Sequence, residues 1–289
     1  MTKTCSHRCR GCVEATLIGL MLAGAVACEE SRSSARAPIA LDTDTVVQWK
    51  LPKRLAEISG LAFSADDRLF AHNDEQGVIY QLDWQAGRIV KAFVLGETPI
   101  REDFEGIAIA GADFYLLTSG GILYRTREGA DGEHVVYQRI DTGLGAQCEF
   151  EGLAYDGQRK LLLAACKNPR SAALKGQVAV FAWSLQRQAV DQAASFTVPV
   201  AALADRIDVR HFNPSSIEIS RDGKQLWLLA GKQQALAEVD LRGQVVAVTR
   251  LSATLHPQPE GLTFGPGGEL IIADEGTQGR AKLAIYRPR

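Results

Sequence analysis

The chain has 289 residues, of which 46% are hydrophobic, and its formal net charge is −2. This length and apolar content are sufficient for one large folded domain. The near-neutral charge and an aromatic content of only 7% argue against the basic surfaces and stacking platforms of nucleic-acid-binding proteins. We therefore expect no nucleic acid partner.

The first 27 residues have the pattern of a signal peptide. Three basic residues precede an apolar run over 15–27, which is too short to span a bilayer. The run ends in the letters AVAC, a sequence that resembles a bacterial lipobox and whose last residue is Cys28. This resemblance implies a lipid on Cys28. Ordinary cleavage before that residue, which would give a soluble exported protein, is the alternative.

The lipobox resemblance also predicts where the protein resides. It implies a lipoprotein of the bacterial cell envelope that faces the periplasm and is held to the membrane by its lipid. Glu30 stands just after the cysteine, where an aspartate would favour the inner membrane, so we expect the outer membrane. Residues 28–44 are predicted to form the lipidated cysteine and a flexible tether, and residues 45–289 the folded domain.

A phrase of the type Glu-Gly-Leu-Ala-Tyr recurs along the chain. Its central residue, the anchor of each repeat, is Gly60, Gly106, Gly152, Ser216 and Gly261 in turn. The steps between successive anchors are 46, 46, 64 and 45 residues. A period in the forties built from short apolar strands is typical of a β-propeller with one four-stranded blade in each repeat.

The strands predicted within the repeats indicate how the ring closes. The first repeat has apolar runs at 60–63, 68–72, 78–83 and 89–95, separated by turn residues. The last repeat supplies only three strands, and the spare strand at 46–51 would complete its blade and remove the open edges. We therefore predict an all-β propeller with five four-stranded blades. The long fourth step leaves six blades as the alternative.

Two cysteines of the folded domain are predicted to meet. Cys148 begins and Cys166 ends a hairpin whose turn centres on Gln158. Pairing about this turn sets residue 148 opposite 168, one pleat from Cys166. An exported protein can keep disulfides, so we predict this bond, with two free thiols as the alternative.

Polar residues cluster just before each anchor. The first strands of propeller blades line the channel, so equivalent positions meet around one axis. Crowded carboxylates raise one another's pKa and favour a bound cation such as Ca²⁺, which accepts hard oxygen ligands. The alternative is that these side chains cap backbone N–H groups or bind water. The residues one position before the anchor are Ser59, Glu105, Glu151, Ser215 and Glu260, and those three before it are Glu57, Asp103, Glu149, Asn213 and Gln258.

A second acidic set follows the second strands of two repeats. Asp74 and Glu75 in the first repeat match Asp274 and Glu275 in the last, and these blades would be neighbours in a closed ring. Two acidic pairs side by side would form a ligand or metal site. The alternative is that the aspartates accept hydrogen bonds from their own turns. Lys167 occupies the corresponding place in the third repeat, where it would neutralise the acids or bind an anion.

Several of these phrases together resemble the SdiA-regulated family of bacterial β-propellers over roughly residues 45–288. The phrases are ISGLA at 58–62, HNDE at 72–75, DFEGIA at 103–108 and EFEGLAY at 149–155. The resemblance implies an exported, membrane-associated propeller with no established chemistry. The fourth repeat departs from the pattern, with PSSI at 214–217, and this departure argues against a symmetric metal ring.

Two functions remain open from the sequence. The first is a non-catalytic, monomeric envelope domain that binds a ligand or protein, because neither G-x-S-x-G nor a zinc-type cluster occurs in the folded part. The second is a calcium-dependent hydrolase of the lactonase or phytase-like esterase type, whose metal would polarise a carbonyl or phosphoryl oxygen. The candidate residues are Glu57, Asp74, Glu75, Glu105, Glu149, Glu151, Asn213, Glu260, Asp274 and Glu275.

Overall fold

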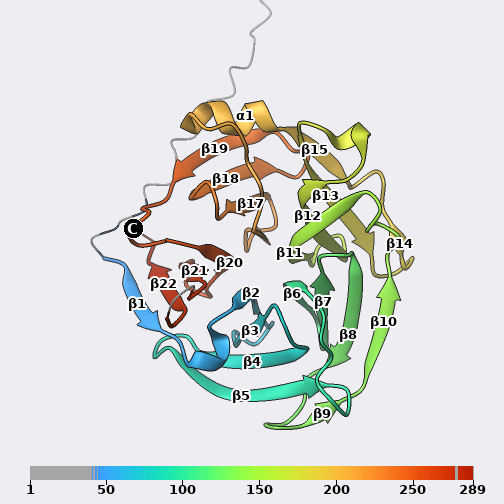
Figure 1. Cartoon of the computed structure of the whole chain (residues 1–289), viewed down its shortest axis with the longest axis vertical. Helices are drawn as coiled ribbons and strands as arrows, with labels where there is room; N and C mark the ends of the chain where they lie inside the picture. The colour runs from blue at the N-terminus through green and yellow to red at the C-terminus, as the bar shows by residue number, and fades with distance from the viewer. Residues whose placement is uncertain (1–40, 42, 44, 277–278, 289) are drawn as a thin grey trace, which may run out of the picture. The chain divides into compact units, whose positions relative to one another are not determined.

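The computed structural model describes residues 41, 43, 45–276 and 279–288. The predicted signal peptide, Cys28 and most of the tether lie outside the described residues. Five sheets surround a common axis, so the predicted five-bladed β-propeller is confirmed and the six-bladed alternative is wrong (Figure 1).

In the first four blades the strands follow one another in chain order from the axis to the outer edge, and in blade 5 the outermost place is taken by β1 (Val47–Lys50). Blade 1 contains β2 (Ile58–Phe63), β3 (Leu69–Asn73), β4 (Val78–Asp83) and β5 (Arg88–Leu95), with β9 (His134–Val135) added in parallel at its outer edge. Blade 2 contains β6 (Phe104–Ala110), β7 (Asp113–Thr118), β8 (Ile122–Arg127) and β10 (Tyr137–Asp141).

The other three blades follow the same plan. Blade 3 contains β11 (Cys148–Asp156), β12 (Leu161–Pro169) and β13 (Gln177–Ser184), whose outer edge pairs with β14 (Ala189–Val190) and β15 (Phe196–Pro199). Blade 4 contains β16 (Ser216–Ile219), β17 (Gln225–Ala230), β18 (Ala235–Asp240) and β19 (Val245–Arg250). Blade 5 contains β20 (Pro259–Phe264), β21 (Leu270–Asp274), β22 (Lys282–Tyr286) and β1 (Val47–Lys50).

Blade 5 joins the two ends of the described chain. Strand β1 pairs antiparallel with β22, with Val47 opposite Ile285 and Lys50 opposite Lys282. This arrangement confirms the prediction that an N-terminal strand completes the last blade. It leaves the sheet without the open edge that β22 would otherwise present.

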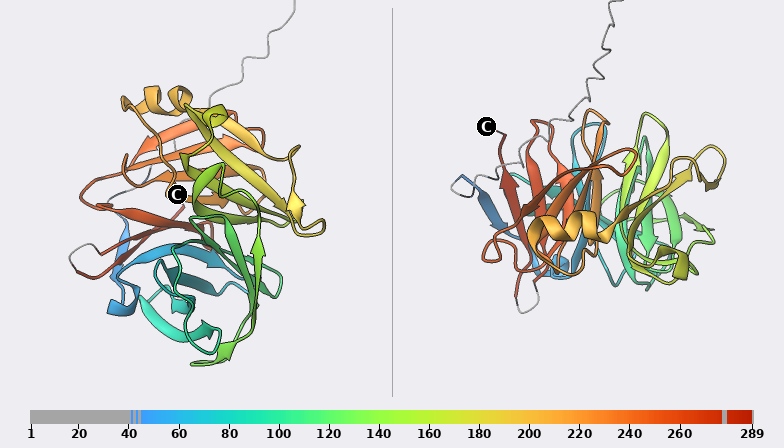
Figure 2. Two further views of the ribbon diagram at one scale, coloured as in Figure 1. Left: turned by 45° about the vertical axis from the view of Figure 1, so that its right-hand side comes forward. Right: turned by 90° about the horizontal axis from the view of Figure 1, so that it is seen from above.

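The long step between the third and fourth anchors does not form a further blade. Its extra residues form α1 (Val200–Ala204) and η3 (Asp205–Ile207), which lie outside β19 (Figure 1; Figure 2). Arg206 donates to the backbone oxygens of Val245 and Val246 and so fastens the excursion to blade 4. The remaining short helices are η1 (Lys53–Leu55) and η2 (Ala172–Leu174), and no helix of the described residues is long and apolar enough to cross a membrane.

Apolar residues fill the space between neighbouring blades. Each sheet presents its inner strand to the axis, so both of its faces are covered by the neighbouring blades. The described residues form one apolar cluster at each blade junction. Between blades 1 and 2, Phe70 and Phe114 pack edge to face with their ring centroids 4.9 Å apart. These interfaces supply most of the buried apolar surface and hold the blades together.

Two anchor glycines let the inner strands approach closely. A Cβ on Gly106 would lie 2.6 Å from the backbone nitrogen of Leu153 in blade 3. A Cβ on Gly152, whose φ is +90°, would lie 2.7 Å from the backbone nitrogen of Ile217 in blade 4. Neither position has room for a side chain, which explains why the repeated phrase carries glycine there.

Cys148 and Cys166 are joined by a disulfide, with their Cα atoms 5.7 Å apart. The strand register at Cys148 differs from the expected one by a residue, because Cys148 lies opposite Pro169. The difference arises at the turn: Asp156 lies opposite Leu161, so the hairpin is centred between Gln158 and Arg159, and the irregularities between Glu149 and Leu153 cancel.

We expect Gly106→Ala to lower the free energy of unfolding by about 1–3 kcal/mol, because the new methyl would push against the backbone of β11. Gly120→Ala is the matched control. Its nearest neighbour would be 3.8 Å away, so its effect should stay within roughly 0.5 kcal/mol. Urea denaturation measures both, and equal stabilities would contradict the close-approach argument.

Candidate functional site

A β-bulge places one side chain of each repeated phrase toward the axis. In blades 1, 2 and 5 the residue before the glycine has no partner on the second strand: these residues are Ser59, Glu105 and Glu260. The bulge of blade 3 lies around Glu151. An unpaired bulge residue is free to point away from its sheet, and bulges commonly aim side chains at functional sites.

These residues, with Ser215 of blade 4, form what we call the axial group. Ser59 donates to Glu105 at 3.2 Å, which links blades 1 and 2. Ser215 donates to the Pro259 oxygen at 2.8 Å, which links blades 4 and 5. Hydrogen bonds of the axial group therefore cross from one blade to the next.

The axial group contains its own cation. Lys167, two residues before the end of β12, forms an ion pair with Glu151, which is only 3% exposed. The Lys167 charge also opposes the rise in pKa of Glu105 and of Glu260. The positive charge of one lysine thus favours the ionised form of three carboxyls.

Even with this lysine, the pKa values of two carboxyls of the axial group, Glu105 and Glu260, are raised. Burial, followed by the nearby charge of Asp103, raises the pKa of Glu105 to about 8. Burial raises the pKa of Glu260 to about 7, against the opposing effects of Lys167, Ser215 and Lys232. At neutral pH, Glu105 and Glu260 are therefore protonated in part of the molecules.

A second set, which we call the rim group, lies where blades 1 and 5 meet and consists of Glu57, Asp74, Glu75 and Glu275. The backbone joins these blades, since the Gly276 nitrogen donates to the Ala56 oxygen at 2.8 Å. Burial, followed by the charge of Glu57, raises the pKa of Asp74 to about 6. Burial, followed by a hydrogen bond shared with Glu57, raises the pKa of Glu275 to about 8.

One atom of the rim group is left without a hydrogen bond. The Oδ1 atom of Asp74 is buried and has no partner, although the Asp74 nitrogen donates to the Glu57 oxygen at 3.2 Å. The amide of Gln258 donates to Glu275. Buried carboxylate oxygens usually accept hydrogen bonds, so the Asp74 atom has capacity for a further donor or a cation.

Asp274 is turned away from the rim group and into blade 5. Its Oδ2 atom lies 2.7 Å from Nδ1 of His256, and its Oδ1 atom accepts from the Gln258 nitrogen at 3.2 Å. The other ring nitrogen of His256 lies 2.6 Å from the Tyr286 hydroxyl. All three side chains are buried, and the chain of hydrogen bonds supports the loop that carries Gln258. The fourth repeat carries His211 at the same place, five positions before its anchor, but that residue is exposed, so the repeat pattern alone did not mark His256 as part of a buried network.

The remaining candidates are held by their neighbours. Glu149 accepts from the Asn168 amide at 3.0 Å. Asn213 donates to the Lys167 oxygen at 3.0 Å and exchanges hydrogen bonds with Gln233, so it fixes the backbone that carries Lys167. Within the described part of the chain, no group of three or more His, Cys, Asp or Glu residues is arranged to hold a metal ion.

The fold and this site define a β-propeller that gathers polar groups where its inner strands begin. The chain belongs to the SdiA-regulated family, whose family model matches residues 40–278. No curated protein matches the sequence.

One solved structure of low sequence identity shares the fold, and others are similar to this chain to a lesser degree. The glutaminyl cyclase of Myxococcus xanthus has a TM-score of 0.57 and 17% identity, with 83% of this chain and 95% of that chain covered. A luciferin-regenerating enzyme has a TM-score of 0.49 and 12% identity, with coverage of 84% and 97%. A streptogramin B lyase has a TM-score of 0.43 and 12% identity, with coverage of 83% and 96%. At these identities the likeness is one of fold alone.

We expect the protein to lose stability as the pH rises from about 6.5 to about 8.5. The pKa values of Glu260, Glu105 and Glu275 are raised to about 7, 8 and 8, above the ordinary 4.5, so in this window the folded state binds more protons than the unfolded state. Stability is therefore greatest on the acid side of this window. Buried His72, whose pKa is lowered to about 4, has the opposite effect only below its ordinary value of 6.5.

Urea denaturation across that window checks this expectation, and Glu275→Gln should make the decline shallower. The control is Glu97→Gln, a change at an exposed residue, which should follow the wild type. A stability that rises with pH over this window would contradict the assignment.

Proposed function

We propose that this chain is an exported, lipid-anchored β-propeller of the bacterial outer membrane that binds a ligand or protein partner from the periplasm. Its binding site is the rim group, and what it recognises is positive charge. The single observation behind this site is the crowding at the junction of two blades, where burial and the nearby Glu57 raise the pKa values of Asp74 and Glu275.

A positive partner is favoured because it would relieve this crowding. A cation near Asp74 and Glu275 would lower both pKa values, and the carboxyls would release protons as it bound. The Oδ1 atom of Asp74 would gain the partner that it lacks. The axial group is less suited to this role, because Lys167 already pairs with Glu151.

A calcium-dependent hydrolase is the second candidate, and one observation favours it. The pKa of Glu275, raised to about 8, lies close to the range in which a carboxyl acts as a general acid or base at neutral pH. In that case Ca²⁺ bound among the oxygens of the rim group would polarise the substrate, and Glu275 would transfer the proton.

Calorimetric titration of the purified protein at pH 7 with Ca²⁺ and, separately, with pentalysine tests the site. Repeating each titration in two buffers of different ionisation enthalpy counts the protons released. We expect binding with proton release, weakened at least tenfold by Glu275→Gln and unchanged by Glu97→Gln. If neither probe binds, the rim group is not a cation site. Calcium binding together with chelator-sensitive cleavage of lactone or phosphoester probes would favour the hydrolase.

Metabolic labelling with an alkyne fatty acid tests the anchor. We expect the full chain, expressed in a bacterium, to carry the label in the outer-membrane fraction. Cys28→Ser should abolish the label, whereas Cys12→Ser, within the predicted signal peptide, should keep it. An unlabelled soluble protein that begins at residue 28 would instead support ordinary cleavage.

A further inference from the structure

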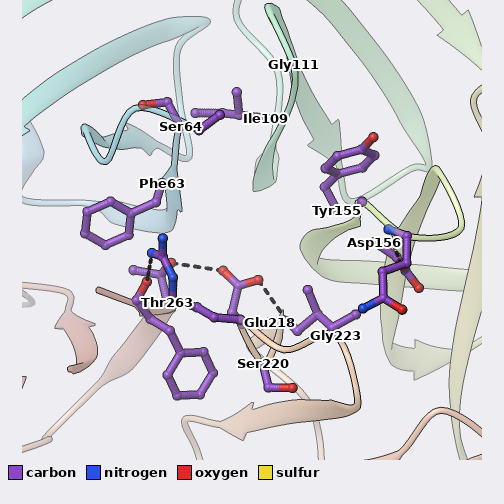
Figure 3. Close-up of a pocket in the computed structure, with 16 residues that line it drawn as sticks. Phe63, Ser64, Ile109, Gly111, Tyr155, Asp156, Glu218, Ser220, Gly223 and Thr263 are labelled. Carbon is purple, nitrogen blue, oxygen red and sulfur yellow. Dashed lines mark hydrogen bonds between the residues drawn. The ribbon is translucent and has the colours of Figure 1, made fainter. Parts of the chain in front are cut away.

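A hollow of about 360 Å³ lies where the inner strands end, at the opposite end of the axis from the axial group (Figure 3). Each of the five inner strands contributes the residue three positions after its anchor: Phe63, Ile109, Tyr155, Ile219 and Phe264. The volume falls within the range of about 300–1,000 Å³ that is usual for small-molecule sites. None of the sequence-derived candidate residues lies in it.

The hollow is lined by two carboxyls, Asp156, which pairs with Arg159, and Glu218, which the repeat does not call for. Two positions after the anchor, the other blades carry Ala62, Ala108, Ala154 and Thr263, whereas blade 4 carries Glu218. Figure 3 shows the Glu218 side chain pointing into the space between Phe63 and Tyr155. Because alanine serves this position in three blades, the fold itself does not require a glutamate there.

The Glu218 carboxyl is held in place but is not neutralised. Its Oε1 atom accepts from the Ile219 nitrogen at 2.8 Å, and its Oε2 atom accepts from the Thr263 hydroxyl at 2.9 Å. Among the described residues no basic side chain forms an ion pair with it. Arg221, which also lines the hollow, is engaged at 2.9 Å by Asp67 of blade 1.

This environment raises the free energy of the charged form of Glu218. Burial raises the pKa of Glu218 to about 7, and the two hydrogen bonds and the more distant Arg221 only partly oppose that effect. A fixed carboxylate without a counter-ion is a strong attractant for a cation that brings its own charge into the hollow.

The walls of the hollow favour an organic cation over a metal ion. Phe63 and Phe264 line it and are each braced edge to face by a tryptophan, with ring centroids 6.0 Å from Trp84 and 5.4 Å from Trp227. Aromatic faces attract organic ammonium groups and pack against flat apolar bodies. Ca²⁺ needs six to eight oxygen ligands, and the carboxylate of Glu218 falls well short of that number, because the other carboxylate of the hollow, Asp156, already pairs with Arg159.

We propose that this hollow is a second binding site, specific for a small organic amine whose ammonium group pairs with Glu218 and whose flat apolar body rests against the aromatic walls. The site is separate from the rim group, and it stands or falls independently of the function proposed above.

Three probes of similar shape test the proposal: phenethylamine, 2-phenylethanol and 3-phenylpropionate, each titrated into the purified protein and followed by amide chemical shifts. We expect phenethylamine to shift the amides of Ile219 and Thr263. The neutral alcohol should bind at least tenfold more weakly, and the anion should not bind. Affinity for the amine should increase from pH 6 to pH 8 as Glu218 loses its proton, because the amine stays charged throughout.

Two variants keep the test decisive. Glu218→Gln retains the shape, with its oxygen accepting from the Ile219 nitrogen and its amide donating to the Thr263 hydroxyl, and Glu218→Ala restores the residue found in three other blades, so both should fold. Each should weaken phenethylamine at least tenfold, whereas Glu97→Gln should not. Equal binding of the three probes, retention of amine binding in both Glu218 variants, or displacement of the amine by equimolar Ca²⁺ would overturn the proposal. Amine binding that persists without Glu218 would place the cation at the rim group instead.

Discussion

The structure depends on how closely the backbones of its inner strands approach one another. At Gly106 and Gly152 the next strand lies where a side chain would have to be, so the first strands pack around the axis with little space between them. Immediately before each of these glycines a bulge frees one residue from the sheet. The same short phrase therefore sets the spacing of the ring and turns polar side chains toward its centre. Blade 4 has serine at its anchor and no such bulge, and its polar residue Ser215 bonds to the neighbouring backbone.

This close packing concentrates acidic groups that would otherwise repel one another, and the protein manages them in three ways. Lys167 compensates the buried carboxyl of Glu151 with a positive charge. Hydrogen bonds restrain others, as between Ser59 and Glu105. Where neither suffices, as at Glu275, the pKa is raised and a proton takes the place of a counter-ion. A site that holds protons in this way is ready to exchange them for a cation, which connects the electrostatics of the ring to the proposed binding role.

Much of this arrangement could be predicted from the sequence, because the repeat is regular. The anchors gave the blade count, the closing strand and the positions that face the axis, since each follows from a fixed spacing. The partners of those positions could not be predicted in the same way. Asp274 occupies the same repeat position as Asp74, yet it bonds to His256, whereas the first repeat has Leu55 at the position equivalent to His256. The register at Cys148 differs from the expected one by a residue because the hairpin turn is centred between Gln158 and Arg159 rather than on Gln158. Glu218 could not be predicted as a site residue, because the polar positions of the repeat precede the anchors and Glu218 follows one.

The closure of blade 5 has a consequence for how the protein reaches its native state. Strand β1 is made early in synthesis, but its partner β22 lies at the far end of the folded domain, with Val47 opposite Ile285. No local hairpin can satisfy β1, so its hydrogen-bonding edge stays unpaired until the last strand has been completed. Contacts of such long sequence separation slow folding and lengthen the time during which strand edges can pair wrongly. Blades 1 to 4 are each built from segments close in sequence and can form first. The ring closes last, and it closes at the junction that carries the rim group.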